Sequence, residues 1–456
     1  MATFTTEDET YNNDNDNNSK NKKNISSILP TLGKFEDLNL IKIIERWSSL
    51  PDLPLEDATD IEKEKVEILR ANVLKAQGLK EPPKGTWKNH HYRKGQMLCY
   101  LRARGGDVDL ATKRALECID FLNTVFEKAK EYEGYPQSKK DLFNQSEPQG
   151  IFGKDKRGAS VFYYKYGNSD RGSVVQRVGW DFFSCWDWRF ALYYWDTLFQ
   201  DGIENGVFLQ GRTWVMDCEG ISYARIIRGR WLAPKQTGKF PGGEHPMPEG
   251  IKHCFVRNTP WIVQKVYNWL KRFLPERTQR KVRFFSKSDD EKYLEALLKE
   301  VDSDQIPACF GGTSKIKWPY SNGPDLRNVT EDEHEKINVS TIETVENIVQ
   351  PNSTCLVEIK IVSKDINISI EALNVNSGSK EIIVENVKIT SVEGWRSFRC
   401  QIPKEIKKEN FVPGEQSFKL MVTFDNSFSW LYGKTVLYRF VLLEEEVLEE
   451  EDSQNN

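Results

Sequence analysis

The hydrophobic pattern of the chain begins near residue 37 and is helical as far as residue 132. Apolar residues in this region recur at mixed three- and four-residue spacing, which is typical of helices with one buried face. Pro82 with Pro83, and then Gly105 with Gly106, interrupt the pattern and separate its blocks. The sequence predicts helices over 61–75, 96–103 and 110–132.

Between residues 150 and 319, short β-rich runs alternate with helical runs. This alternation predicts an α/β sheet that is covered by helices. Ser288 and Glu291 have the spacing of a capping box and predict the start of the last helix of this region. The expected strands cover 160–166, 213–216, 253–257 and 282–285, and the expected helices cover 185–199, 261–274 and 289–301.

After a polar, acidic linker at 321–336, the apolar residues alternate with polar ones at period two. Short alternating strands separated by polar turns predict an all-β sandwich. The ends of the chain lack any such pattern: residues 1–35 have the composition of a disordered leader, and residues 444–456 form an acidic tail. The expected strands of the sandwich lie within 355–362, 366–371, 418–424 and 436–443.

Composition excludes several classes of protein. The chain has 64 Lys and Arg against 68 Asp and Glu, a net charge of -4, so no overall positive field attracts nucleic acid. The chain contains no run of 18 or more apolar residues, the length that is needed to span a bilayer. Its N-terminus has no apolar signal-peptide region. Eight widely spaced cysteines without a CxxC pair are typical of a reducing compartment. We therefore expect a cytoplasmic protein.

Catalytic and metal-binding motifs fail on spacing. His253-Cys254 resembles the start of a cysteine-phosphatase loop, but Pro260 stands where that loop needs an arginine. The Phe310-Gly-Gly-Thr-Ser-Lys segment lacks P-loop spacing, and no histidine pairs with a glutamate at the spacing of a zinc site. Asp217 follows an apolar strand without a neighbouring base, which favours a hydrogen-bonding role at the strand end. We therefore expect that the protein is not an enzyme and that it binds no cofactor and no metal.

Aromatic residues are abundant, with 13 Trp, 16 Tyr and 24 Phe, and many of them lie between 162 and 285. Such residues usually pack a core, but the lining of an apolar ligand cavity needs the same types. Their number alone does not distinguish these two roles.

Four strings, in the same order along about 220 residues, resemble the CRAL-TRIO lipid-binding family, which includes phosphatidylinositol/phosphatidylcholine transfer proteins. The resemblance covers a helical string, a strand with its turn, an asparagine–proline turn followed by a helix and strand, and a closing segment. They are Leu101-Arg-Ala-Arg104-Gly-Gly-Asp107-Val108-Asp-Leu-Ala111, Trp214-Val-Met-Asp217-Cys-Glu-Gly220-Ile, Phe255-Val-Arg-Asn258-Thr-Pro260 with Lys271-Arg-Phe-Leu274 and Thr278-Gln-Arg-Lys281-Val, and Ile306-Pro-Ala-Cys-Phe310-Gly311-Gly312.

Further along the chain, Phe424-Asp-Asn426-Ser-Phe-Ser429-Trp-Leu-Tyr-Gly-Lys434-Thr-Val-Leu-Tyr438 resembles the last hairpin of a GOLD (Golgi dynamics) sandwich. The two resemblances imply an α/β CRAL-TRIO lipid-binding domain, preceded by a small all-α domain and followed by an all-β GOLD sandwich. The expected division is a leader at 1–35, a helical segment at 36–83, the N-terminal helical CRAL-TRIO domain at 84–135, the lipid-binding domain at 145–318, the GOLD-like sandwich at 336–443 and the acidic tail at 444–456.

The resemblance implies that the protein encloses phosphatidylinositol, or a related phospholipid, in a gated apolar pocket and moves it between membranes without reacting it. Enclosure is favourable because each buried CH₂ contributes roughly 0.8 kcal/mol. The family's inositol-phosphate positions correspond here to Arg104, Glu249, Thr278 and Lys281. Arginine, threonine and lysine can donate hydrogen bonds to a phosphate, and glutamate can accept them from inositol hydroxyls or pair with Lys281.

The resemblance also implies a gate helix and a second lipid site. The gate falls on residues 261–274, where an apolar stripe would be hidden in the closed state; its members are Ile262, Val266, Trp269, Leu270 and Phe273. The family's phosphatidylcholine positions, normally small hydroxyl side chains and tyrosine, correspond to Phe162, Trp188, Arg212 and Trp214. Because these are bulky or charged, we expect the second ligand to be another lipid, a sterol-like or isoprenoid molecule, or none.

Two alternatives remain open at this point. The same fold could carry a small hydrophobe such as a tocopherol, retinoid or squalene, although Arg104 and Lys281 argue for a phospholipid. It could also be a trafficking scaffold in which the GOLD-like sandwich recruits a protein partner and the lipid is only sensed. In each case we expect transient contact with a membrane surface, with Golgi and endosomal membranes as candidates.

Overall fold

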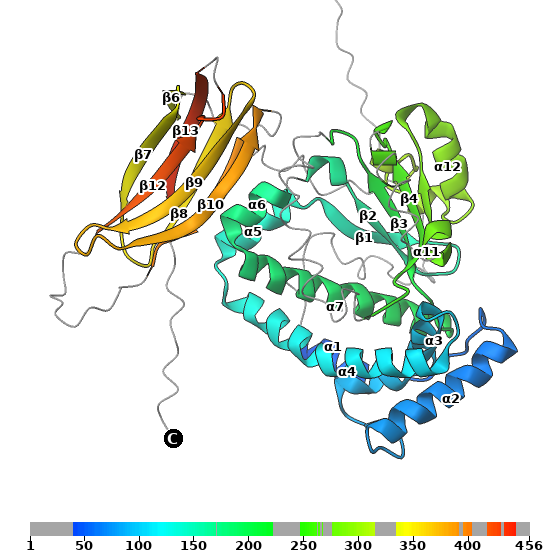
Figure 1. The fold of residues 1–456 in the computed structure, drawn as a ribbon. Helices are drawn as coiled ribbons and strands as arrows, with labels where there is room; N and C mark the ends of the chain where they lie inside the picture. Colours follow the sequence, from blue (N-terminus) through cyan, green and yellow to red (C-terminus); the bar gives the residue numbers. More distant parts are fainter. Residues whose placement is uncertain are drawn as a thin grey trace, which may run out of the picture.

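The structure is a computed structural model, and Figure 1 shows its fold. It describes residues 40–169, 171–221, 247–261, 276–314, 334–391, 395–403, 417–429 and 433–443, together with 263, 264 and 267.

The first helices form one packed unit. Thr59 and Glu62 make a capping box at the start of the second helix, and Asp107 caps the fourth. The second, third and fourth helices bury their apolar faces in a common core, so the chain on both sides of Pro82 contributes to it. The elements are α1 (Leu40–Ser48), α2 (Asp60–Ala76), η3 (Trp87–Tyr92), α3 (Lys94–Ala103), α4 (Val108–Glu131), η4 (Tyr132–Gly134) and α5 (Gln137–Ser146).

A five-stranded sheet follows in the order β1-β2-β3-β4-β5, with β1 antiparallel to β2 and the remaining pairs parallel. Its four parallel strands confirm the strands that alternation predicted, whereas β1 was not predicted. Alternate side chains of each strand face opposite sides of the sheet. The strands are β1 (Gln149–Lys154), β2 (Ser160–Tyr164), β3 (Arg212–Asp217), β4 (Ile251–Arg257) and β5 (Val282–Phe284).

Helices cover both faces of this sheet (Figure 1). The long helix α7 (Trp180–Asn205) packs on the face that carries Phe162, and it is bounded by Gly179 and Gly206, both with positive φ. On the other face, α12 (Asp290–Leu298) packs through Tyr293 and Leu297. The remaining elements of the domain are η5 (Tyr166–Asn168), α6 (Arg171–Val178), α11 (Glu276–Lys281), η8 (Lys287–Asp289), η9 (Ser303–Gln305) and η10 (Ala308–Phe310).

The predicted capping box of Ser288 with Glu291 is wrong. Ser286 and Asp289 form the box instead, because β5 ends at Phe284 and the chain enters a single 3-10 turn, Lys287–Asp289, before α12 begins. Ser286 and Ser288 are each followed by an acidic residue three positions later, so the sequence does not distinguish them. The position at which β5 ends determines which serine caps the turn.

The C-terminal region is an all-β sandwich, as period two predicted. Its sheets have the orders β10-β9-β12-β7 and β11-β8-β13-β6, with every pair antiparallel. Buried aliphatic residues of both sheets fill the space between them. The strands are β6 (Glu335–Val339), β7 (Ile342–Val349), β8 (Thr354–Ile361), β9 (Asp365–Asn374), β10 (Lys380–Thr390), β11 (Trp395–Gln401), β12 (Phe418–Asp425) and β13 (Lys434–Leu443).

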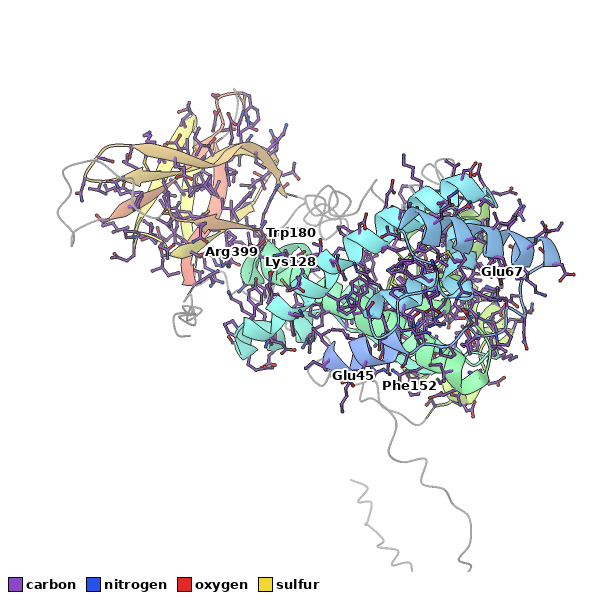
Figure 2. The ribbon with its side chains drawn as sticks, turned by 90° about the horizontal axis from the view of Figure 1, so that it is seen from below. Glu45, Glu67, Lys128, Phe152, Trp180 and Arg399 are labelled. Carbon is purple, nitrogen blue, oxygen red and sulfur yellow. The ribbon has the colours of Figure 1, made fainter. Side chains whose placement is uncertain are left out.

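The sandwich contacts the α/β domain at α6. The backbone N–H of Arg399 on β11 donates to Gln176 Oε1 at 2.9 Å, and Arg399 Nη1 donates to the Arg177 carbonyl at 2.9 Å. Figure 2 labels Arg399 beside Trp180, at the junction between the two domains. The contacts of α6 with β11 fix where the sandwich sits on the domain that carries the site described next.

Candidate functional site

A cavity of about 590 Å³ lies between α7 and the sheet. It extends along α7 from Trp186 to Trp195, which corresponds to about 14 Å at 1.5 Å per residue. Aromatic and other apolar side chains form its wall, and polar groups stand at its two ends. The lining residues are Gln149, Phe162, Tyr164, Tyr166, Arg171, Trp186, Asp187, Trp188, Phe190, Ala191, Tyr194, Trp195, Trp214, Met216, Met247, Pro248, Glu249, Gly250, Ile251 and Lys281.

The aromatic wall is fixed by strand register and by hydrogen bonds. Phe162 and Trp214 are partners on neighbouring parallel strands, and their ring centroids lie 4.7 Å apart. Trp214 Nε1 donates to the hydroxyl of Tyr194 at 2.6 Å, and that hydroxyl donates to the Gly250 carbonyl at 2.7 Å. Burial raises the pKa of Tyr194, which therefore keeps its proton. The indole N–H of Trp214 and the hydroxyl of Tyr194 are thus satisfied within the protein.

At one end of the cavity, Glu249 accepts hydrogen bonds from three side chains. Lys281 Nζ lies 2.7 Å from Glu249 Oε2, Arg277 Nε lies 3.2 Å from it, and Gln210 Nε2 donates to it at 3.0 Å. Glu249 has φ of 65°, a conformation that is uncommon for residues other than Gly, Asn and Asp and that often marks a functional position. The structure therefore brings Glu249 and Lys281 together at the cavity. Thr278 belongs to α11, but its side chain lies outside the described part of the chain.

Arg104 is not among the residues that line the cavity. It is the C-cap of α3, and its Nη1 donates to the Ala103 carbonyl at 3.2 Å. The arginine that reaches the Glu249 cluster is Arg102, which donates to Gln210 Oε1 and, at 2.7 Å, to Glu62 Oε1. This bidentate pair lowers the pKa of Glu62 to about 2. Sequence reasoning missed Arg102, which stands two positions before Arg104 in the same string. Residues two positions apart on a helix point to different sides, so only one of these two arginines can face the cluster.

Arg212 faces α7 but lies beneath the wall. It is 0% exposed, and its Nη2 donates to the Tyr194 carbonyl at 2.6 Å and to Thr197 Oγ1 at 2.7 Å. Its guanidinium lies 4.4 Å from the centroid of the Tyr194 ring, and Tyr194 lines the cavity whereas Arg212 does not. Of the four residues assigned to the second lipid site, Phe162, Trp188 and Trp214 line the cavity and Arg212 does not.

The other end of the cavity carries a charged cluster that the sequence did not reveal. Arg171 donates to Glu147 Oε2 through Nη2 at 2.6 Å and through Nε at 3.2 Å. Glu147 also accepts from the hydroxyls of Tyr164 at 2.7 Å and Ser169 at 2.6 Å. These residues come from separate elements without a common motif, so no sequence signal links them.

The five residues assigned to the gate stripe, namely Ile262, Val266, Trp269, Leu270 and Phe273, lie outside the described residues. Trp261, Val263, Gln264 and Tyr267 of the same segment are described, and Val263 N donates to the Pro260 carbonyl at 3.0 Å. The gate assignment stays a prediction.

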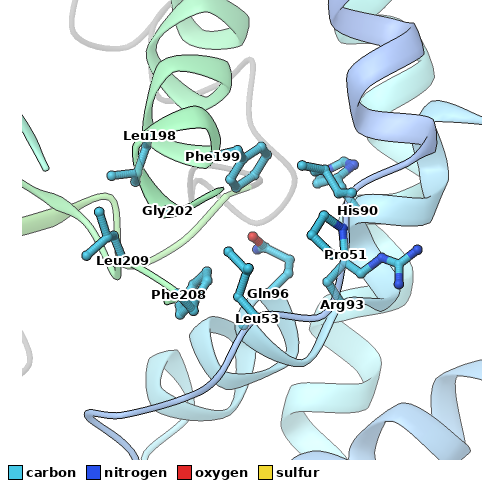
Figure 3. Close-up of a pocket in the computed structure, with 12 residues that line it drawn as sticks. Pro51, Leu53, His90, Arg93, Gln96, Leu198, Phe199, Gly202, Phe208 and Leu209 are labelled. Atoms are coloured by element: carbon cyan, nitrogen blue, oxygen red, sulfur yellow. The ribbon is translucent and has the colours of Figure 1, made fainter. Parts of the chain in front are cut away.

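A second, much smaller cavity of about 30 Å³ lies between α3 and α7 (Figure 3). His90 and Gln96 line it together with Leu53, Phe199 and Phe208. This volume suits one or two water-sized molecules and is too small for a lipid. Burial lowers the pKa of His90 to about 3, so the imidazole is neutral. We therefore place lipid chemistry in the larger cavity.

Within the residues that the structure describes, no three or more His, Cys, Asp or Glu side chains are arranged to hold a metal ion. None of the described helices combines the length and the apolar character that crossing a membrane requires.

An apolar cavity between a mixed sheet and an aromatic helix, with polar residues at its ends, defines a class of proteins that enclose hydrophobic ligands. Residues 144–312 match the sequence model of the CRAL/TRIO domain. This part of the chain is therefore a CRAL/TRIO domain, which confirms the resemblance found in the sequence. The assignment of the sandwich to the GOLD family stays a prediction.

Several known proteins are similar to this chain. Phosphatidylinositol/phosphatidylcholine transfer protein SFH9 of Arabidopsis thaliana is 22% identical over 272 residues, which cover 57% of this chain and 43% of that protein. Sec14 cytosolic factor of Schizosaccharomyces pombe is 34% identical over 65 residues, 14% of this chain and 21% of that protein. The crystal structure of Sfh5 aligns with a TM-score of 0.33 and 17% identity over 51% of this chain and 82% of that one. The chain thus spans less than half the length of the Arabidopsis relative.

Proposed function

We propose that this protein binds phosphatidylinositol in the cavity between α7 and the sheet and transfers it between membranes, in membrane traffic or phosphoinositide signalling. The observation that carries the proposal is the pairing of Glu249 with Lys281 at the end of an apolar cavity inside a CRAL/TRIO domain. The apolar wall covers the acyl chains and keeps their CH₂ groups out of water while the lipid passes between membranes.

The headgroup end has the right chemistry for an inositol phosphate. Lys281 and Arg277 supply cationic donors, and the Glu249 carboxylate accepts from ring hydroxyls. A ligand phosphate can replace the Glu249 carboxylate as the partner of Lys281, so Lys281 has an anionic partner both before and after the lipid binds. The sequence resemblance adds Thr278 and Arg104 to this set, and of the two arginines at the end of α3 it is Arg102 that reaches the Glu249 cluster, through Gln210.

The test is transfer of phosphatidylinositol between vesicles by the full chain. Glu249→Ala combined with Lys281→Ala should abolish transfer while the far-ultraviolet circular dichroism spectrum stays unchanged. The matched control is Asp57→Ala with Lys252→Ala, which removes an ion pair of 3.0 Å that does not line the cavity. Unchanged transfer in the Glu249–Lys281 variant, or equal loss in the control, contradicts the proposal.

Phosphatidylcholine should be a poor ligand. Phe162, Trp188 and Trp214 occupy the cavity wall with large rings and no spare hydroxyl, so a choline phosphate gains neither room nor donors. Exchange of phosphatidylcholine at the rate of phosphatidylinositol would contradict this selectivity. We further propose that residues 261–274 act as the gate and that the sandwich contacts a protein or membrane partner.

A second candidate function is the carriage of a smaller hydrophobe. The specific observation in its favour is the aromatic wall, because nine of the twenty described lining residues are Phe, Tyr or Trp. Lipid extraction from the purified protein, followed by mass spectrometry, separates the two: phosphatidylinositol supports the first function, and a neutral hydrophobe alone supports the second.

A further inference from the structure

Helix α6 connects the ligand cavity with the sandwich. Its first residue, Arg171, lines the cavity and donates to the buried Glu147 at 2.6 and 3.2 Å. Near its other end, Gln176 is bonded to β11 and Arg177 to β8. The eight residues of α6 extend over about 12 Å at 1.5 Å per residue. One rigid helix of about two turns therefore reaches from the cavity to the sandwich.

The contacts at the sandwich end of α6 are polar and specific. Arg177 Nη2 lies 2.7 Å from Oε1 of Glu358, which is only 3% exposed. Arg399 donates from Nη1 to the Arg177 carbonyl and from its backbone N–H to Gln176 Oε1, both at 2.9 Å. The Arg399 side chain also lies 3.6 Å from the place that a Cβ would take on Gly179, the residue that separates α6 from α7. The sandwich thus fixes the last turn of α6 and the turn that follows it.

An apolar contact joins the same helix to the wall of the cavity. Val174, Val175 and Val178 of α6 are at most 2% exposed and belong to one cluster with Trp186 of α7. Trp186 lines the cavity, as Arg171 does. A displacement of α6 would therefore change the cavity at two places, at its charged end and at its aromatic wall.

The length of α6 makes it dependent on these contacts. A helix of eight residues is marginal in isolation, so tertiary packing keeps it in place. Binding that orders a segment costs conformational entropy, and a second binding event at the segment already ordered costs less. Docking of the sandwich orders α6 and so lowers the cost of binding a ligand at its other end. Coupling of this kind is reciprocal, so a ligand must favour docking to the same extent.

We propose that the sandwich regulates the cavity through α6: the docked sandwich strengthens ligand binding, and a bound ligand strengthens docking. A partner that draws the sandwich away from α6 then promotes release of the ligand. The inference rests on the proposed function in that it takes phosphatidylinositol as the regulated ligand. It assigns the sandwich a role at a cavity whose described lining residues all belong to the α/β domain.

The test weakens docking by changes in the sandwich alone, in the full-length protein. Glu358→Gln with Arg399→Met removes the ion pair to Arg177 and the hydrogen bond to its carbonyl, and it leaves the sequence of the α/β domain unchanged. Trp186, Trp188, Trp195 and Trp214 line the cavity, so energy transfer from tryptophan to pyrene-labelled phosphatidylinositol reports binding. The variant should bind this lipid at least about fivefold more weakly, the lower end of the usual coupling between two sites.

The matched control is Glu346→Gln with Lys419→Met. It removes an ion pair of 2.7 Å between β7 and β12, in the sheet of the sandwich that does not contain β8 and β11. The control should leave the affinity unchanged. Arg399→Met alone keeps the ion pair of Arg177 with Glu358 and should give a smaller loss in the same direction, which guards against misfolding of the double variant.

Hydrogen exchange checks both directions of the coupling. Exchange in α6 should accelerate in the Glu358→Gln, Arg399→Met variant without lipid, and phosphatidylinositol should slow exchange in β11 of the wild-type protein. Unchanged affinity in this variant, an equal loss in the control, or exchange in β11 that does not respond to lipid would each overturn the inference.

A second probe separates this inference from the proposed function. cis-Parinaric acid is a fluorescent fatty acid without an inositol headgroup, and its binding is measured by the same energy transfer. A wild-type protein that binds parinaric acid but no phosphatidylinositol, with weaker parinaric acid binding in the variant, would contradict the proposed function and support the coupling. Equal phosphatidylinositol affinity in both proteins contradicts the coupling alone, and a wild-type protein that binds neither probe contradicts both.

Discussion

Arg177 of α6 and Glu358 of β8 form an ion pair across the boundary between the α/β domain and the sandwich, with 2.7 Å between Nη2 and Oε1. Glu358 is only 3% exposed and also accepts from Arg439 at 2.6 Å and from the Ser397 hydroxyl at 3.2 Å. A buried carboxylate held from both domains gives their contact a defined orientation. Because Arg171 and Arg177 lie on the same short helix, the contact also bears on the polar end of the cavity.

Arg177→Met should weaken the docking of the sandwich by about 1–3 kcal/mol, because a hydrogen bond to a buried charge is lost while Arg439 still balances Glu358. Hydrogen exchange should accelerate in α6 and β11 and stay unchanged in β9 and β12. The control is Lys388→Met, which removes a surface pair with Asp365 and a cation–π contact with Phe428, both within the sandwich. Unchanged exchange in α6 would show that other contacts determine the docking.

Arg212→Ala should destabilise the α/β domain by about 2–5 kcal/mol, since it leaves a cavity and unpaired carbonyl groups beneath α7. Ligand selectivity should not change, because Arg212 is fully buried and does not line the cavity. Arg212→Met, which keeps most of the volume, should recover part of the stability. Urea unfolding with a parallel vesicle-transfer assay checks both statements. Altered selectivity would restore Arg212 to the second lipid site, where the sequence resemblance assigned it.

His90 should make the N-terminal helices sensitive to acid. Its pKa lies at about 3 in the folded state because burial disfavours the cation, against 6.5 ordinarily. The unfolded chain therefore binds a proton that the folded chain does not, and stability falls as the pH drops from 6.5 towards 3. By pH 5 this loss amounts to about 2 kcal/mol. In His90→Gln the stability measured by urea unfolding should depend less on pH between 7 and 5. An identical pH dependence in both proteins would rule out this role for His90.

The positions of most elements followed from periodicity. The predicted helices at 61–75, 96–103 and 110–132 agree with α2, α3 and α4 within about two residues at each end. Helix α7 is longer at both ends than the predicted 185–199, because aromatic residues on several of its faces obscure the 3.6-residue period. Strand β1 was missed because its two glycines, Gly150 and Gly153, weaken the strand signal.

The site was less accessible to sequence reasoning than the fold. Glu249 and Lys281 were assigned by resemblance, and the structure brings them into contact. The cluster of Arg171 with Glu147 depends on tertiary packing between segments 24 residues apart, and no local pattern encodes it. Whether an arginine such as Arg212 reaches a cavity or is held beneath a helix depends on its tertiary hydrogen bonds, here to the Tyr194 carbonyl and Thr197, which a strand pattern does not specify.

Arg102 and Arg104 offer the sharpest test of the headgroup end, because the sequence resemblance assigns Arg104 and the structure connects Arg102 to Glu249 through Gln210. Arg102→Gln should lower phosphatidylinositol transfer roughly tenfold, since Gln210 then no longer holds the carboxylate in place. Arg104→Gln should change transfer much less. Loss of the pair with Glu62 will also destabilise Arg102→Gln, so transfer must be compared per folded molecule and as a ratio of phosphatidylinositol to phosphatidylcholine.

Glu62→Gln is the matched control for that comparison, because it removes the same ion pair and leaves the hydrogen bond from Arg102 to Gln210. It should lose stability and keep the phosphatidylinositol preference. If Arg104→Gln loses the preference while Arg102→Gln keeps it, Arg104 is the residue that contacts the headgroup. The helix end at Arg104 must then approach the cavity when lipid is bound.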